Sequence, residues 1–110
     1  MLQQAIVYKL KKEKFQVALA ASGEEAMDKL KAETPNLIWL DLLMPGMGGM
    51  KFLEILRSEP EWEKLPVIIV SVYNDPQRIK KAFELNVIDY LVKSEASFND
   101  AVNKIKTHIK

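Results

Sequence analysis

The chain has 110 residues, the length of about one domain, and a composition of 48% apolar and 28% charged residues, which argues against disorder and coiled coil. A formal net charge of +1 provides no field that would draw the protein to nucleic acid or to anionic lipid, so we expect neither as a partner. Because the chain contains no cysteine and a single histidine, His108, the sequence excludes disulfides, thiolate zinc sites, a cysteine nucleophile and a histidine metal cluster.

The N-terminal part of the sequence alternates between helical and strand patterns. Apolar residues recur at helical spacing from Leu2 to Leu10, and lysines gather toward the end of this segment, which predicts a first amphipathic helix. The stretch Phe15–Ala20 has a period of two, typical of a strand at or near the edge of a sheet. Ser22 begins a capping-box pattern that opens the next helix, and Pro35 must end that helix.

Two strongly apolar segments occupy the middle of the sequence. The segment Leu37–Met44 is apolar apart from Asp41, which predicts a central parallel strand buried on both faces. Pro45 and the glycines Gly46, Gly48 and Gly49 turn the chain, and the segment Val67–Val72 predicts a second buried strand. The helix expected between these two strands has an apolar face made of Phe52, Leu53, Ile55 and Leu56.

The C-terminal part continues the alternation. Asn74 or Asp75 can cap the next helix, whose first turn contains Pro76. We expect its inner face to consist of Ile79, Ala82 and Phe83. The segment Val87–Val92 predicts a third apolar strand, and Ser97 begins a capping pattern for a final helix. The apolar face of that helix is expected to be Phe98, Ala101, Val102, Ile105 and Ile109.

Three polar residues follow or end the apolar strands of this predicted α/β parallel sheet. They are Asp41, Ser71 and Lys93, and we expect them to converge because the carboxyl ends of parallel strands share one edge, where ligands bind. A carboxylate can act as a nucleophile toward a phosphoryl group, with a cation, a hydroxyl and normally Mg²⁺ to stabilise the transferred group. Each residue also has an ordinary interpretation, as a turn cap, a turn former or a solvated lysine.

The segments Leu40–Gly49, Val70–Ser71 and Asp89–Lys93 resemble three motifs of the response regulator receiver domain of two-component signalling. The resemblance covers residues 1–110 as one receiver-like domain and implies a flavodoxin-like doubly wound parallel sheet of strand order 2-1-3-4-5. It implies that Asp41 accepts a phosphoryl group whose oxygens contact Ser71 and Lys93. It also implies that Asp41 and the backbone carbonyl of Leu43 are Mg²⁺ ligands, and that Tyr90 turns inward on activation. The alternative for Tyr90 is an ordinary aromatic residue at the strand surface.

The sequence departs from this family at its start. Family members begin with a strand that ends in a pair of acidic Mg²⁺ ligands, whereas this sequence begins in the first helix and contains neither feature. We therefore expect weakened Mg²⁺ binding, since Asp41 is the one carboxylate placed at the site. The middle of the sheet would contain a gap. Three things could fill this gap: the second strand slides across to pair with the third, another chain donates a segment by swapping, or the chain is part of a longer protein. We expect the chain as given to self-associate.

The expected function is that of a cytoplasmic phosphorelay domain, not an enzyme. Its partners would be a histidine kinase or phosphotransfer protein and a downstream protein. The apolar stretches run six or seven residues, too short for the roughly 20 residues that span a bilayer, so we expect no membrane partner. Two alternatives are a phosphorylation-incompetent module for interaction or self-association, and a nucleotide- or flavin-binding protein. The latter is disfavoured because no glycine-rich phosphate loop follows a strand.

Overall fold

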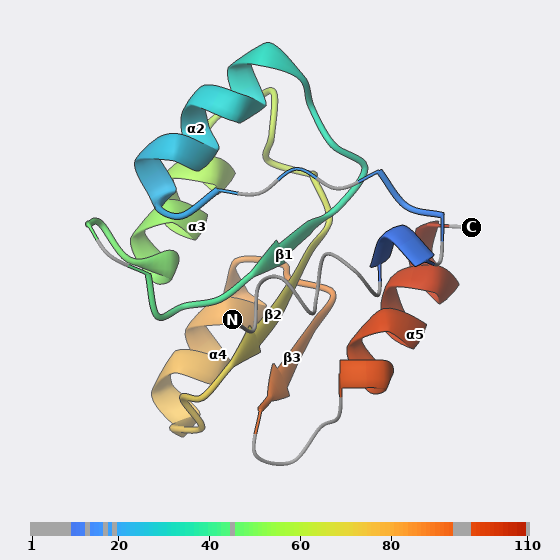
Figure 1. Ribbon diagram of the computed structural model, residues 1–110. Helices are drawn as coiled ribbons and strands as arrows, with labels where there is room; N and C mark the ends of the chain where they lie inside the picture. Colours follow the sequence, from blue (N-terminus) through green and yellow to red (C-terminus); the bar gives the residue numbers. More distant parts are fainter. Residues whose placement is uncertain are drawn as a thin grey trace.

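The computed structural model describes residues 10–12, 14–16, 18, 20–44, 46–93 and 98–109. Helices and strands alternate along these residues (Figure 1). The helices are α2 (Gly23–Ala32), α3 (Gly49–Ser58), α4 (Pro76–Glu84) and α5 (Phe98–Ile109), and the strands are β1 (Ile38–Leu40), β2 (Val67–Ser71) and β3 (Asp89–Val92). The strands form one parallel sheet in the order β1-β2-β3. The predicted α/β class with a parallel sheet is confirmed.

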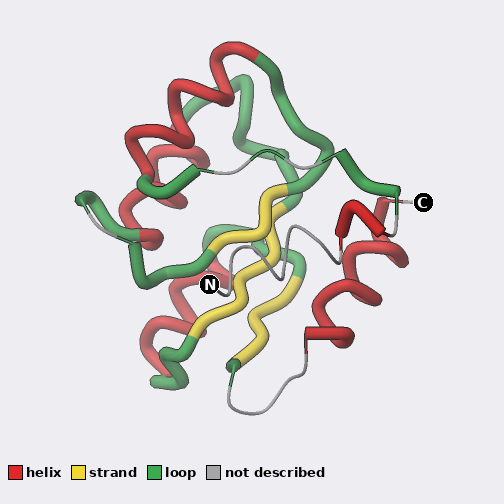
Figure 2. Tube along the Cα trace, in the orientation of Figure 1, coloured by secondary structure: helices red, strands yellow, loops and turns green. Residues whose placement is uncertain are grey.

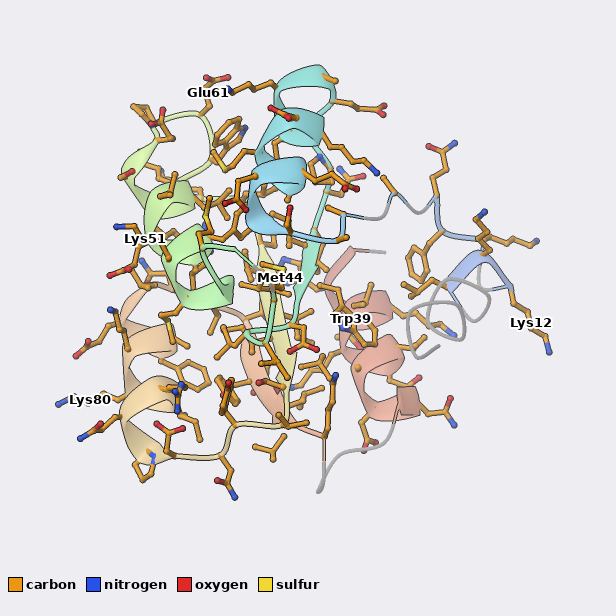
Figure 3. The ribbon with its side chains drawn as sticks, turned by 60° about the vertical axis from the view of Figure 1, so that its left-hand side comes forward. Lys12, Trp39, Met44, Lys51, Glu61 and Lys80 are labelled. Atoms are coloured by element: carbon orange, nitrogen blue, oxygen red, sulfur yellow. The ribbon has the colours of Figure 1, made fainter. Side chains whose placement is uncertain are left out.

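Alternating side chains of the strands pack against two separate helical layers. On one face Leu40, Ile69 and Tyr90 belong to a core that includes buried residues of α2, α3 and α4. On the other face Ile68 contacts buried residues of α5, with Trp39 and Leu91 packed beside it. Figures 1 and 2 show the sheet between these two layers. Figure 3 places Trp39 beside α5. Because β2 is covered on both faces, all five of its residues are buried.

Short polar side chains begin two of the helices, as the sequence predicts. The Ser22 hydroxyl accepts the backbone N–H of Glu25 at 3.2 Å at the start of α2. At α4 the cap is Asp75, not Asn74, and its carboxylate accepts the backbone N–H of Arg78 at 3.2 Å. Pro76 occupies the first turn of α4, where its missing N–H costs nothing. Ser97, the predicted cap of α5, lies outside the described residues.

The predicted strand over Phe15–Ala20 is not formed at the residues that the structure describes, while Val17 and Leu19 lie outside them. A helix end explains the difference. Lys14 adopts a φ of 72°, and the N–H of Phe15 donates to the carbonyl of Leu10 at 3.0 Å, which is a Schellman motif. Phe15 then packs against the cluster of Leu10, Ile68 and α5 residues on the α5 side of the sheet. Most of the predicted first helix, residues 1–9, also lies outside the described residues.

Two further expectations are corrected. The strand predicted over Leu37–Met44 is only Ile38–Leu40, because the chain turns directly after Leu40. Phe83 was expected on the inner face of α4, but it is 46% exposed, and the fully buried residue of this helix is Ala82. Within the part of the chain that the structure describes, no helix has both the length and the apolar character required to cross a membrane.

The side chain of Arg57 joins two loops at the end of the sheet where β2 begins. Its guanidinium donates to the carbonyls of Trp62 and Leu65 in the loop that precedes β2. It also donates to the carbonyls of Leu85 and Asn86 in the loop that follows α4. Burial lowers the pKa of Arg57 from its ordinary value, which is far too high for the charge to be lost. One side chain thus supplies hydrogen bonds to four backbone carbonyls.

Candidate functional site

The carboxyl ends of the three strands meet at one edge of the sheet and carry the predicted polar residues. Asp41 follows β1 directly, Ser71 is the last residue of β2, and Lys93 follows β3 directly. The register places Ser71 opposite Val92, and the backbone N–H of Lys93 donates to the carbonyl of Ser71 at 2.8 Å. This last bond continues the sheet by one residue. It therefore fixes where the lysine side chain leaves the backbone.

Lys93 and Asp41 form an ion pair across this edge. The Nζ atom of Lys93 lies 2.7 Å from Oδ2 of Asp41. The two side chains are 27% and 33% exposed, so the pair is partly accessible to solvent. The structure thus brings together a carboxylate and a cation that lie 52 residues apart in the sequence.

The loop that holds Asp41 is folded tightly against its own backbone. Oδ1 of Asp41 accepts the N–H of Leu43 at 2.9 Å, which is an Asx turn. The carbonyl of Leu42 accepts the N–H of Gly49 at 3.0 Å. A Cβ atom at Gly49 would lie 2.5 Å from the Cα atom of Leu42 and 2.7 Å from the carbonyl oxygen of Asp41. Residue 49 therefore has to be glycine if the loop is to keep this shape.

Ser71 ends β2 at this edge, and Tyr90 lies within the neighbouring strand β3. Ser71 is fully buried, and its hydroxyl accepts the N–H of Tyr73 at 3.2 Å. Tyr90 is also buried, and its hydroxyl donates to the carbonyl of Tyr73 at 2.8 Å. Burial raises the pKa of Tyr90, and the nearby Ser71 hydroxyl opposes this shift. Tyr90 is thus buried in this structure, and its turning inward on activation stays a prediction.

The predicted Mg²⁺ ligands are incomplete among the described residues. Magnesium favours six oxygen ligands, usually including one or two carboxylates. Both oxygens of Asp41 already accept hydrogen bonds, from Lys93 and from Leu43. No group of three acidic, histidine or cysteine side chains that could hold a metal occurs in the described ranges. The described residues therefore do not fit a complete Mg²⁺ site, and the role of the Leu43 carbonyl as a ligand stays a prediction.

Sequence reasoning did not identify three residues that shape this site. Gly49 fixes the shape of the loop after Asp41. The glycines around it predict a turn, but not this specific role. Tyr73 contacts Ser71 and Tyr90 through its backbone, and backbone contacts leave no mark on residue type. Arg78 lies over the Tyr73 ring, with its guanidinium carbon 4.0 Å from the ring centroid. Its position one turn into α4 could be read from the sequence, but its partner could not.

Comparison with known proteins identifies the family. The family model of the response regulator receiver domain matches residues 1–106. The chain belongs to this family. Receiver domains are signalling modules, not classical enzymes. As a family they accept phosphoryl groups from histidine kinases or phosphotransfer proteins, generally with Mg²⁺, and act on downstream effectors.

Two curated relatives have 38% and 33% of their residues identical to this chain over the aligned segments. Protein RcaC of Microchaete diplosiphon is 38% identical over 79 residues, which are 72% of this chain and 12% of RcaC. The phosphate regulon transcriptional regulatory protein PhoB of Rhizobium meliloti is 33% identical over 86 residues, which are 78% of this chain and 38% of PhoB. The chain therefore spans less than half the length of these relatives.

Solved structures share the fold over almost the whole chain. A DNA-binding response regulator of the LuxR family from Staphylococcus aureus is 32% identical, with a TM-score of 0.82, and the match covers 97% of this chain and 88% of that chain. The BeF3-activated receiver domain of RstA from Klebsiella pneumoniae is 22% identical, with a TM-score of 0.86 and coverage of 99% and 90%. These neighbours confirm the flavodoxin-like fold. The alternative of a module without phosphoryl chemistry gains no support from them.

Proposed function

We propose that this chain is a phosphorylated switch in which Asp41 accepts a phosphoryl group from the phosphohistidine of a histidine kinase or phosphotransfer protein. One observation carries the proposal, namely the ion pair of Lys93 with Asp41 at the sheet edge where Ser71 ends the neighbouring strand β2 and its carbonyl accepts the backbone N–H of Lys93. A structural ion pair would not require a hydroxyl at the end of the neighbouring strand. A phosphoryl acceptor does, because the transferred group brings oxygens that need donors.

The reaction forms an oxygen–phosphorus bond and breaks a nitrogen–phosphorus bond. A carboxylate oxygen of Asp41 attacks the phosphorus, and the histidine of the donor leaves with the electron pair and takes up a proton. The ammonium group of Lys93 moves from the carboxylate to a phosphoryl oxygen, where it offsets part of the added charge of about −1.5 to −2. Ser71 accepts a hydrogen bond from Tyr73 and has one proton of its own to donate, which in this proposal turns from the neighbouring Tyr90 hydroxyl to a second phosphoryl oxygen.

The buried hydroxyl of Tyr90 supplies the readout of this event. Since Ser71 and Tyr90 both bond to the backbone of Tyr73, a movement of Ser71 toward a phosphoryl group changes the surroundings of Tyr90. The surface formed by α4, β3 and α5 then changes its affinity for a downstream protein. The expectation of self-association stays a separate prediction, and the molar mass in solution tests it directly.

The test is the phosphorylation of the purified chain by phosphoramidate, a nitrogen–phosphorus donor, with Mg²⁺ present and absent. Intact mass should increase by one phosphoryl group, and Asp41→Asn should abolish the increase. The matched control is Asp28→Asn, which removes an exposed carboxylate from α2 and should be phosphorylated like the original chain. An original chain that gains no mass, or an Asp41→Asn variant that still gains it, contradicts the proposal.

A further inference from the structure

The backbone of Tyr73 joins the two residues of the proposed switch. Its N–H donates to the Ser71 hydroxyl at 3.2 Å, and its carbonyl accepts the Tyr90 hydroxyl at 2.8 Å. Ser71 ends β2 and Tyr90 lies within β3, so the two residues come from neighbouring strands. The position of this single peptide segment therefore decides whether the buried hydroxyl of Tyr90 has an acceptor.

The ring of Tyr73 is in turn held by the first turn of α4. The guanidinium carbon of Arg78 lies 4.0 Å from the ring centroid, which is a cation–π contact. Arg78 is oriented by Asp75, because its Nη1 atom lies 2.7 Å from a carboxylate oxygen of Asp75. Asp75 is itself fixed as the N-cap of α4. We call this group, made of Tyr73, Asp75 and Arg78, the α4 clamp.

Resting on the proposed function, we infer that Arg78 is a positioning residue of the switch. It holds the Tyr73 ring, and thereby keeps the Tyr73 carbonyl where the Tyr90 hydroxyl can reach it. Without the guanidinium, the segment after Ser71 has one fewer attachment to α4, and Tyr90 loses its acceptor more often. Arg78 touches neither Asp41 nor a transferred group in this arrangement, so its effect passes through Tyr73.

A cation–π contact at an exposed site changes an equilibrium by a modest factor. Arg78 is 47% exposed on its side chain. We therefore expect its removal to raise the population of outward or mobile Tyr90 by about two- to five-fold, and not to abolish the buried state. Replacement by lysine keeps the charge but loses the flat guanidinium that stacks on the ring, so Arg78→Lys should give a smaller shift in the same direction.

The first experiment observes Tyr90 directly in the chain without a phosphodonor. NMR spectra of tyrosine-labelled protein are recorded for the original chain, Arg78→Met, Arg78→Lys and the control Lys80→Met, with Tyr90 assigned from Tyr90→Phe. Lys80 is an exposed residue of the same helix, and Figure 3 shows it pointing away from the protein. We expect the Tyr90 ring signals to move toward those of exposed tyrosine in Arg78→Met and to stay in place in Lys80→Met. Unchanged Tyr90 signals in both Arg78 variants would overturn the inference.

The second experiment links this effect to the site. The rate of phosphorylation by phosphoramidate should change by about two- to five-fold in Arg78→Met, with Asp41 still the acceptor and with Lys80→Met unchanged. A shifted Tyr90 signal with an unchanged rate would overturn the role of Arg78 in the switch. Because the NMR measurement needs no phosphorylation, a failure of Asp41 to accept phosphate and a failure of the α4 clamp give different results.

Discussion

Nζ of Lys93 lies 2.7 Å from Oδ2 of Asp41, and the backbone N–H of the same lysine donates to the carbonyl of Ser71. Lys93 therefore contacts the ends of both other strands, that of β1 through its side chain and that of β2 through its backbone. A residue fixed by the sheet in this way can stabilise charge at Asp41 without first having to be ordered.

Replacement of Lys93 should slow phosphorylation while leaving the free energy of unfolding almost unchanged. We expect Lys93→Met to lower the rate of phosphorylation by phosphoramidate by about 10²-fold or more, since one fixed donor at developing charge is typically worth that factor. The free energy of unfolding should change little, because the partly exposed pair contributes about 0–1 kcal/mol. Lys104→Met, which removes a lysine from α5, is the control and should retain the rate. A Lys93→Met variant with the original rate contradicts the proposed role.

Gly49→Ala should destabilise the chain and disturb the Asp41 loop together. The added Cβ atom would lie 2.5 Å from the Cα atom of Leu42, a backbone atom that cannot move aside cheaply. We expect a loss of about 1–3 kcal/mol in the free energy of unfolding, together with slower phosphorylation. Urea denaturation and intact mass measure the two effects. Lys51→Ala, an exposed position in the same helix, is the control, and equal stability of the two variants would contradict this account.

Arg57→Met should reduce stability without a direct effect on the site. It removes donors to the carbonyls of Trp62, Leu65, Leu85 and Asn86. Partly buried carbonyls then lack partners, and we expect the free energy of unfolding to fall by about 1–3 kcal/mol. Arg57→Lys should recover only part of this loss, because an ammonium cannot reach four acceptors in two loops. Lys64→Met, an exposed position in one of these loops, provides the reference for urea denaturation. A full recovery by lysine would disprove the bridging role.

The pKa of Tyr90 predicts a loss of stability in alkali. Burial raises this pKa above its ordinary value of about 10, so the unfolded chain ionises before the folded chain does. The contribution of the protonated phenol is fully present below about pH 10 and is lost as the pH rises toward the folded-state pKa.

Tyr90→Phe lacks this ionisation, so its stability should fall less steeply than that of the original chain above about pH 10. Urea denaturation from about pH 8 to about pH 11 measures the difference. Tyr73→Phe is the matched control, since it keeps both the ring and the backbone bonds to Ser71 and Tyr90. Parallel stability curves for the original chain and Tyr90→Phe would show that Tyr90 does not contribute in this way.

The sequence predicted correctly those helix starts and strands that are determined by interactions between residues close together in the chain. Ser22 and Pro76 lie at helix starts because capping and the fixed φ of proline act within one turn. The apolar runs around Ile69 and Tyr90 predicted buried strands because strands covered by helices have no polar face. The same logic predicted that residues after parallel strands share an edge, and Asp41 does lie against Lys93 there.

The sequence by itself determined the α/β class, the order of the described elements and the types of side chain at the strand ends. Only the tertiary structure decided where β1 ends, since hydrogen bonds from Leu43 and Gly49 turn the chain there. It also decided that Phe15 packs at a helix end and that Tyr73 joins Ser71 to Tyr90. These contacts are made by backbone groups or by residues distant in the chain, and every residue type carries the same backbone donors and acceptors, apart from proline.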